Sequence, residues 1–174
     1  MQIQPILSND FVRLQPLQNT DFEALYTVAS DPLIWEQHPN KNRYQRSAFE
    51  IYFEGAMKSG GAFLILDVAH GNIIGSTRYY DFDELHSSVL IGYTFIARAY
   101  WGKQINKQIK QLMLAHAFQY VDTVLFHIGA ENIRSQIAMQ RVGGIKKKEI
   151  VVAYHGEPDK LNFEYAIEKK NWTA

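Results

Sequence analysis

The residues best suited to bind a ligand lie at one junction, where a strand pattern runs into a helix pattern. Residues 92–96 are typical of a strand end, and after a short turn residues 107–120 repeat apolar side chains at helical spacing. The first backbone N–H groups of a helix have no partners within the helix, and the helix dipole adds partial positive charge there. The junction therefore predicts an anion site, which we interpret as the place where the pyrophosphate of a nucleotide-like cofactor binds.

Groups that could transfer protons are spread over several segments. Glu84 lies beside Asp81 and Asp83 in an acidic connection, His127 lies within a short apolar run, and Glu131 follows that run. Histidine titrates near neutral pH, which suits a general base. Acidic loops are usually solvated, however, and a histidine in an apolar strand is commonly a core residue. Glu84, His127 and Glu131 therefore stay alternatives, together with a chain of water molecules.

No metal site is expected. The chain has six histidines and no cysteine, and the histidines show no metal-ligand spacing such as His-x-x-x-His. The absence of cysteine also excludes disulfides and cysteine nucleophiles. His116 falls on the apolar stripe of a helix pattern, so we assign it to packing.

The composition indicates one domain spanning residues 1–174. Hydrophobic residues make up 47% of the chain, enough for a sizeable core. Lys plus Arg (18) balances Asp plus Glu (18), which argues against general nucleic-acid or membrane-surface binding. Residues 1–7 do not resemble a signal peptide, and no apolar run reaches about 18 residues. We expect a soluble, cytoplasmic protein.

Hydrophobic periodicity predicts a mixed α/β order. Helices are expected at residues 21–30, 47–58, 107–120 and 133–142, and strands at residues 11–15, 63–68, 73–82, 89–95, 124–128, 150–154 and 163–167. Thr20 and Glu23 have capping-box spacing, Gly75 marks a bulge, and residues 33–46 are expected to form a loop that could include a helical turn. This order favours a mixed sheet of about seven strands with helices on both faces, in which residues 89–128 form a right-handed crossover between parallel strands.

Four separate segments carry a family resemblance. They are Val12–Leu17 followed by Asp21–Phe22, Ile91–Tyr93 followed by Tyr100–Lys103, Asn132–Ser135 followed by Gly143, and Phe163–Ile167 followed by Trp172. In their order and spacing they resemble the GCN5-related N-acetyltransferase (GNAT) superfamily, and within it the RimJ/RimL-type branch of ribosomal-protein N-terminal acetyltransferases and their small-molecule-modifying relatives.

The resemblance implies a GNAT fold with a splayed central parallel pair of strands, and acetyl-CoA as co-substrate. Carried over position by position, the acetyl-CoA contacts fall on Tyr93, Phe95, Ile96, Trp101, Gly102, Lys103, Gln104, Ile105, Asn106, Lys107, Asn132 and Ser135. Trp101, Gln104 and Asn106 depart from the family loop, which usually has Gln or Arg, then Gly, then Gly or Ala at these places. Backbone amides do not depend on side-chain identity, so the anion site survives if the turn keeps its geometry.

The same resemblance implies direct attack by an amine, with no covalent enzyme intermediate. A backbone N–H between Tyr93 and Ile96 is expected to polarise the thioester carbonyl. Ser135 matches a serine thought to lie near the thiolate in this branch, although an ordinary first-turn serine is an equal reading. Asn132 matches a residue that meets the pantetheine arm, and it could also be a helix N-cap. The tyrosine that serves as acid in other branches is replaced by Met139.

Aromatic residues could line the acceptor pocket. Trp35, Tyr79 and Tyr80 are the candidates, although such residues often complete a core instead. The basic run Lys146–Lys148 could contact the 3′-phosphate of the cofactor or an RNA, but a solvated strand entrance is the stronger interpretation.

The sequence therefore predicts an N-acetyltransferase that transfers an acetyl group from acetyl-CoA to a primary amine, on either a protein N-terminus or a small molecule. Glu84 and His127 are its candidate bases and Ser135 its candidate thiolate contact. The alternative is a non-catalytic acyl-CoA-binding or regulatory module. A nucleotide-binding protein of another fold is disfavoured, because no Gly-x-Gly-x-x-Gly or phosphate-loop lysine motif occurs. The sequence also allows the chain to form a homodimer.

Overall fold

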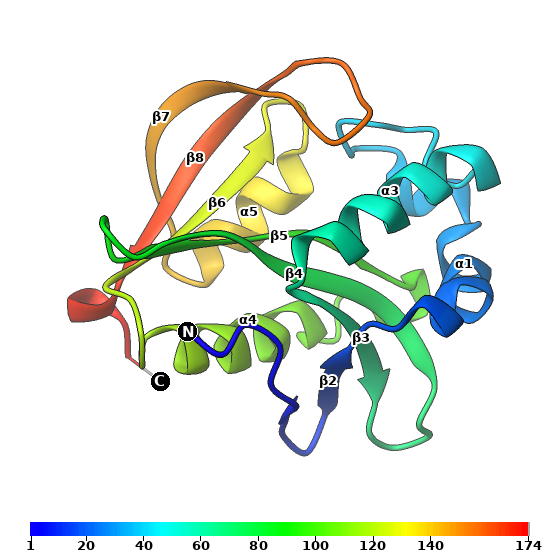
Figure 1. The fold of residues 1–174 in the computed structure, drawn as a ribbon, viewed down its shortest axis with the longest axis horizontal. Coiled ribbons are helices and arrows are strands. Elements are labelled where there is room, and N and C mark those ends of the chain that lie inside the picture. Colours follow the sequence, from blue (N-terminus) through cyan, green and yellow to red (C-terminus); the bar gives the residue numbers. More distant parts are fainter. Residues whose placement is uncertain (174) are drawn as a thin grey trace.

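In the part of the chain that the structure describes, eight strands form one mixed sheet in the order β1-β2-β3-β4-β5-β6-β8-β7, of which Figure 1 labels β2 to β8. The computed structural model describes residues 1–173. The strands are β1 (Leu7–Ser8), β2 (Val12–Pro16), β3 (Ala62–Asp67), β4 (Ile73–Asp83), β5 (Ser88–Ile96), β6 (Thr123–Gly129), β7 (Ile145–Val152) and β8 (Lys160–Glu168). The seven expected strands are confirmed. The eighth, β1, has two residues and is too short to give a periodic signal.

Within residues 1–173, five helices cover the two faces of this sheet. They are α1 (Phe22–Ala29), α2 (Pro32–Trp35), α3 (Arg46–Ser59), α4 (Ile105–Ala117) and α5 (Ile133–Arg141), and short 3-10 turns lie at Asn19–Asp21, Arg98–Tyr100 and Lys169–Asn171. Successive residues of a strand point to opposite faces. Phe63 and Ile65 of β3 accordingly enter one core with α4 and α5. Leu64 enters the other, with α1, α2 and α3.

The central parallel pair separates after a short contact. β5 and β6 pair only at Ser88–Leu90 and Thr123–Leu125, whereas β6 pairs with β8 along its whole length. The later residues of β5, Ile91–Ile96, have no register with β6. This confirms the splayed pair, and it opens one edge of β5 toward the first turns of α4 and α5.

A bulge lies in the splayed part of β5. The register with β4 shifts between Ser76 and Arg78, and Tyr93 has a φ of 53° in the left-handed region. That conformation costs a non-glycine residue about 1–2 kcal/mol. The bulge is supported by the Tyr52 hydroxyl, which donates to Tyr93 O at 2.6 Å, and by the Arg78 guanidinium, 3.7 Å from the Tyr93 ring centroid. Such bulges redirect backbone groups, and this one lies in the part of β5 that has no register with β6.

The expected capping box is wrong. α1 begins at Phe22 after a 3-10 turn, so Thr20 lies inside that turn and Glu23 in the first turn of the helix. Asp21 accepts instead from the backbone N–H of Gln18 at 2.8 Å, and Glu23 pairs with Arg46. The predicted bulge at Gly75 is confirmed, because Gly75 pairs with Ile65 while Ile73 pairs with Leu66.

The β7–β8 hairpin starts earlier than expected. β7 begins at Ile145, so Lys146–Lys148 lie within the strand rather than at its entrance. Their ammonium groups pair with Glu149, Glu168 and Glu164. The basic run is therefore neutralised along the hairpin. Across residues 1–173, no helix is both long enough and apolar enough to cross a membrane.

Candidate active site

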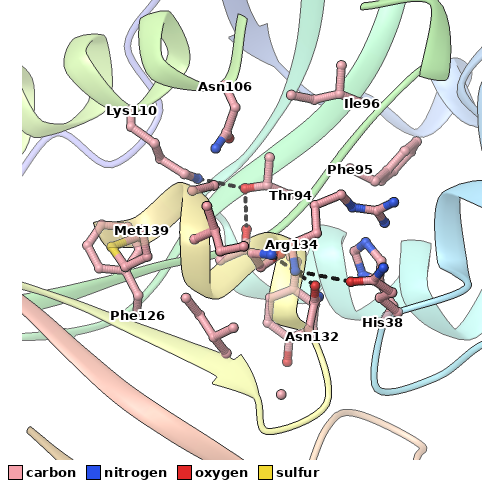
Figure 2. A pocket seen from close by; sticks show the side chains of 18 of the residues that line it. His38, Thr94, Phe95, Ile96, Asn106, Lys110, Phe126, Asn132, Arg134 and Met139 are labelled. Carbon is pink, nitrogen blue, oxygen red and sulfur yellow. Dashed lines mark hydrogen bonds between the residues drawn. The ribbon is translucent and has the colours of Figure 1, made fainter. Parts of the chain in front are cut away.

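A cleft of about 980 Å³ opens where β5 and β6 diverge. Its walls come from Ile91–Ile96 of β5, from the first turns of α4 and α5, and from Phe126–Gly129 of β6. Figure 2 shows Asn106 and Lys110 reaching into it from α4, opposite Asn132 and Arg134 at the start of α5. Eleven of the twelve residues expected to contact acetyl-CoA line this cleft, and the exception is Lys103. The Nζ of Lys103 lies 5.4 Å from the Tyr100 ring centroid instead.

The turn that leads into α4 keeps its geometry without the expected glycine. Gln104 is the N-cap residue of α4, with φ 60° and ψ 9°, and Gly102 has φ 76°. Both values lie in the left-handed region, which glycine adopts without steric cost and other residues adopt rarely. The departure at Gln104 therefore changes the strain in the turn rather than its path. The first residues of α4, Ile105–Lys107, line the cleft, and their N–H groups have no acceptors within the helix.

Trp101 connects the two sides of the cleft. Its Nε1 donates to Ile96 O at 2.8 Å, and the guanidinium of Arg134 lies 4.0 Å from a Trp101 ring centroid. Arg134 also donates to Ile34 O at 3.1 Å, and its backbone N–H donates to Gln37 Oε1 at 3.0 Å. The turn before α4, the first turn of α5 and the α2 segment thus meet at one end of the cleft. Arg134 was within the matched Asn132–Ser135 segment, but its type gave no sign of this contact.

Asn132 caps α5. Its Oδ1 accepts from the backbone N–H of Ser135 at 3.1 Å, and its side chain is buried within the wall of the cleft. This N-cap role leaves its amide nitrogen free of that bond, so contact with a bound ligand remains compatible with capping. Ser135 lines the cleft from the first turn of α5.

His127 is the expected base candidate that lies in the cleft. Its Nε2 is 3.2 Å from Oε2 of Glu164, and each side chain is 14% exposed. Burial lowers the pKa of His127, while Glu164 and Asp81 act to raise it and Lys148 to lower it. Glu164 faces His127 across the β6–β8 register. Sequence reasoning missed this pairing because it depends on which strand lies beside β6.

The other two base candidates lie elsewhere. Glu84 is exposed in the turn between β4 and β5, and Glu131 is exposed between β6 and α5. Neither side chain lines the cleft. The structure thus brings His127 together with the cofactor-binding candidates, but not Glu84 or Glu131.

The three expected aromatic residues divide between core and cleft. Trp35 is buried and donates to Ala29 O at 2.7 Å, and Tyr79 is buried and donates to Met113 O at 2.5 Å. Both complete cores. Tyr80 lines the cleft, and its ring packs edge-on against Tyr93 with centroids 5.2 Å apart. Burial raises the pKa of Tyr80 well above its ordinary value, so its hydroxyl stays protonated at neutral pH.

A buried ion pair closes the end of the cleft near Tyr80. Arg43, before α3, donates from Nε and Nη2 to the two carboxylate oxygens of Glu157 at 2.9 and 3.1 Å. The side chains are 3% and 7% exposed. The Arg43 guanidinium also lies 5.8 Å from the Tyr93 ring centroid and 5.7 Å from that of Tyr154. The pair ties the β7–β8 loop, which arches toward the α2–α3 segment in Figure 1, to the far side of the cleft.

Lys110 of α4 is buried in the wall of the cleft. It is 5% exposed, lines the cleft, and donates from Nζ to Thr94 Oγ1 at 2.7 Å. Burial lowers its pKa to about 7.

Met139 lines the same cleft, so the position of the tyrosine acid in other GNAT branches holds a thioether here. Within residues 1–173, no three His, Asp or Glu side chains gather as a metal-binding group.

Comparison with known proteins agrees with this architecture. The acetyltransferase (GNAT) domain model matches residues 12–145. A GCN5-related N-acetyltransferase from Brucella melitensis aligns with a TM-score of 0.83 at 18% identity, covering 97% of this chain and 80% of that one. A GNAT-family acetyltransferase from Bacillus anthracis aligns with a TM-score of 0.72 at 15% identity, covering 95% and 99%.

Mycobacterium smegmatis RimJ, solved in complex with CoA-disulfide, aligns with a TM-score of 0.71 at 17% identity, covering 95% of this chain and 86% of that one. No curated protein matches the sequence. The structural likenesses show the fold, and the family model covers well over half of the chain. The chain therefore belongs to the GNAT family of acetyltransferases.

Proposed function

We propose that this acetyltransferase uses acetyl-CoA to acetylate a primary amine. The observation that carries the proposal is one continuous cleft, which runs from the open N–H groups of α4 to the His127–Glu164 pair. An anion site and a proton acceptor at opposite ends of one cleft are the two requirements for holding a phosphorylated donor and activating an amine. The fold shared with Mycobacterium smegmatis RimJ, solved in complex with CoA-disulfide, supports the same function.

The residues present fit such a donor. The positive-φ turn at Gly102 and Gln104 presents the N–H groups of Ile105–Lys107, and Lys107 adds charge for phosphates. The splayed edge of β5 offers backbone groups to the pantetheine arm and the thioester carbonyl, with Asn132 on the opposite wall. The donor supplies the activated acetyl group, and the protein supplies its position.

The transfer requires one proton to leave the amine and one to reach the sulfur. His127, neutral and oriented by Glu164, takes the proton from the acceptor nitrogen. The nitrogen forms its bond to the thioester carbonyl carbon while a backbone N–H of the β5 bulge stabilises the developing negative charge on oxygen. The C–S bond then breaks, its electron pair stays on sulfur, and the thiolate takes up a proton.

The acceptor is proposed to enter beside Tyr80, Tyr93 and Tyr154. These rings line the end of the cleft that lies near His127. Of the carboxylates near that end, Glu157 is paired with Arg43 and Glu164 with His127. The wall thus favours an amine carried on an uncharged or aromatic group, such as a protein N-terminus or a small molecule, over a polyamine. We place the reaction in the cytoplasm, which cell fractionation would test.

Two measurements test this function. Calorimetry with acetyl-CoA, CoA and ATP should give binding for the first two only. A thiol-release screen over small amines and N-terminal peptides should then give turnover with at least one amine, confirmed by mass spectrometry of the acetylated product. Binding of CoA without turnover across the panel would support the non-catalytic acyl-CoA-binding module instead. No CoA binding at millimolar ligand would reject both functions.

A further inference from the structure

Lys110 is a buried ammonium group without a carboxylate partner. Its acceptor is Thr94 Oγ1 at 2.7 Å, and this oxygen lies 2.7 Å from Thr77 Oγ1. Among the ion pairs of residues 1–173, none involves Lys110. An unpaired charge in an apolar interior is costly, and a methionine of similar length would fill the same space without that cost. A group retained at such a cost beside a cleft is a candidate for function.

The groups that the structure places next to the Lys110 ammonium are uncharged. Thr94 of β5 accepts its hydrogen bond and is bonded in turn to Thr77 of β4, and the Phe126 ring centroid of β6 lies 5.9 Å from Nζ. Besides Lys110, the cleft walls contain two histidines, four tyrosines and four basic side chains: His38, His127, Tyr80, Tyr93, Tyr100, Tyr154, Arg43, Lys107, Arg134 and Arg141. None of them is an anion. Burial alone therefore accounts for the lowered pKa of Lys110, which lies close to neutral pH.

The position of Lys110 matches the reacting end of the donor. Thr94, its hydrogen-bond acceptor, belongs to the β5 bulge, where the proposed function holds the thioester carbonyl. Ser135, the other donor in this part of the cleft, is a neutral hydroxyl on α5. A hydroxyl is a much weaker acid than an ammonium group and does not attract a thiolate electrostatically.

On the basis of the acetyl transfer proposed above, we infer that Lys110 is the acid that protonates the coenzyme A thiolate. As the C–S bond breaks, a proton passes from Nζ to sulfur and leaves CoA as the free thiol and Lys110 as the neutral amine. His127 meanwhile holds the proton from the acceptor. His127 releases its proton to solvent and Lys110 takes one up, so the net reaction moves one proton from amine to thiol.

The first test uses binding alone and needs no acceptor. If Lys110 faces the sulfur, the pKa of the bound CoA thiol should fall by about 1–3 units, visible as thiolate absorbance in the ultraviolet. The wild-type protein should therefore bind CoA at least about tenfold more tightly relative to acetyl-CoA than Lys110→Met does. Lys107→Met is the matched control, because loss of a phosphate contact should weaken both ligands equally. An unchanged CoA to acetyl-CoA ratio in Lys110→Met would overturn the inference.

The second test uses the acceptor found in the amine screen. Lys110→Met should lower kcat about 100-fold or more with little change in the KM for acetyl-CoA. It should also remove the loss of activity that the wild type shows as pH rises through about 7. Lys110→Arg, which keeps the charge but cannot give up its proton, should be as slow as Lys110→Met; full activity of Lys110→Arg would overturn the inference. Failure of the wild type to acetylate any amine would instead count against the proposed function, and the thiol pKa would still decide the position of Lys110.

Discussion

Gln104 stands where the family loop usually has glycine, and its side chain gives no sign of why glycine is preferred there. The family pattern places glycine there, and the structure gives the reason as a φ of 60° at the N-cap of α4. The sequence showed a departure from the family loop at this position, with the anion site expected to survive if the turn kept its geometry. The backbone follows the turn, and Gln104 carries the steric cost of the left-handed region.

We therefore expect Gln104→Gly to stabilise the protein. Relief of about 1–2 kcal/mol of strain, less about 0.5–1 kcal/mol for the added freedom of glycine in the unfolded chain, should raise the free energy of unfolding by about 0.5–1 kcal/mol. Urea unfolding measures this change. Gly102→Ala is the converse variant, because its φ of 76° should make alanine destabilising. A destabilised Gln104→Gly would mean that the glutamine side chain contributes more than its strain costs.

The pH dependence of the reaction should report on His127 and Glu164. A base must be neutral, so activity should fall as pH drops through the pKa of His127, which burial lowers below 6.5. Glu164 acts to raise that pKa. Glu164→Gln should therefore move the acid limb of the pH–rate profile to lower pH, and His127→Gln should lower kcat about 100-fold or more. A profile that stays in place in Glu164→Gln would exclude His127 as the titrating base, and Glu84→Gln provides the control outside the cleft.

At the scale of elements, the β7–β8 hairpin is held down by charge as well as by strand pairing. Arg43 and Glu157 form a two-bond ion pair between two loops, surrounded by aromatic rings. A buried pair of this kind contributes little net stability as a pair but costs much when one partner is lost. It fixes the end of the cleft through which the acceptor is proposed to enter.

Breaking this pair should be more damaging than replacing it. Glu157→Gln leaves Arg43 buried without a carboxylate and should lower the free energy of unfolding by about 3–5 kcal/mol. The double variant Arg43→Met/Glu157→Leu should recover most of that loss, because no charge is then left unpaired. Denaturant unfolding measures both. Glu23→Gln, which breaks the exposed pair with Arg46, should change the free energy of unfolding little. Equal effects of Glu157→Gln and Glu23→Gln would show that burial does not make the loss of Glu157 costly.

For the whole molecule, periodicity and turn residues were enough to predict the strand and helix order and the mixed sheet. The resemblance located eleven of twelve contact candidates in one cleft. Pairings between distant segments were not predictable, because each depends on which elements become neighbours. Three such pairings are the contact of Glu164 with His127, the ion pair of Glu157 with Arg43, and the hydrogen bond from Lys110 to Thr94. Lys110 was further obscured because a buried lysine has the same sequence signal as an exposed one.

The splay between β5 and β6 divides the sheet into two halves that are joined by only three residue pairs. A donor bound along the open edge of β5 would take the place of the missing neighbouring strand and would contact both halves of the sheet. Hydrogen exchange at Thr94–Ile96 should therefore slow on CoA binding, while exchange at Phe63–Ile65 in the paired strand β3 stays unchanged. The central sheet would then be most rigid when the donor is bound, because the donor stabilises the fold as well as taking part in the reaction.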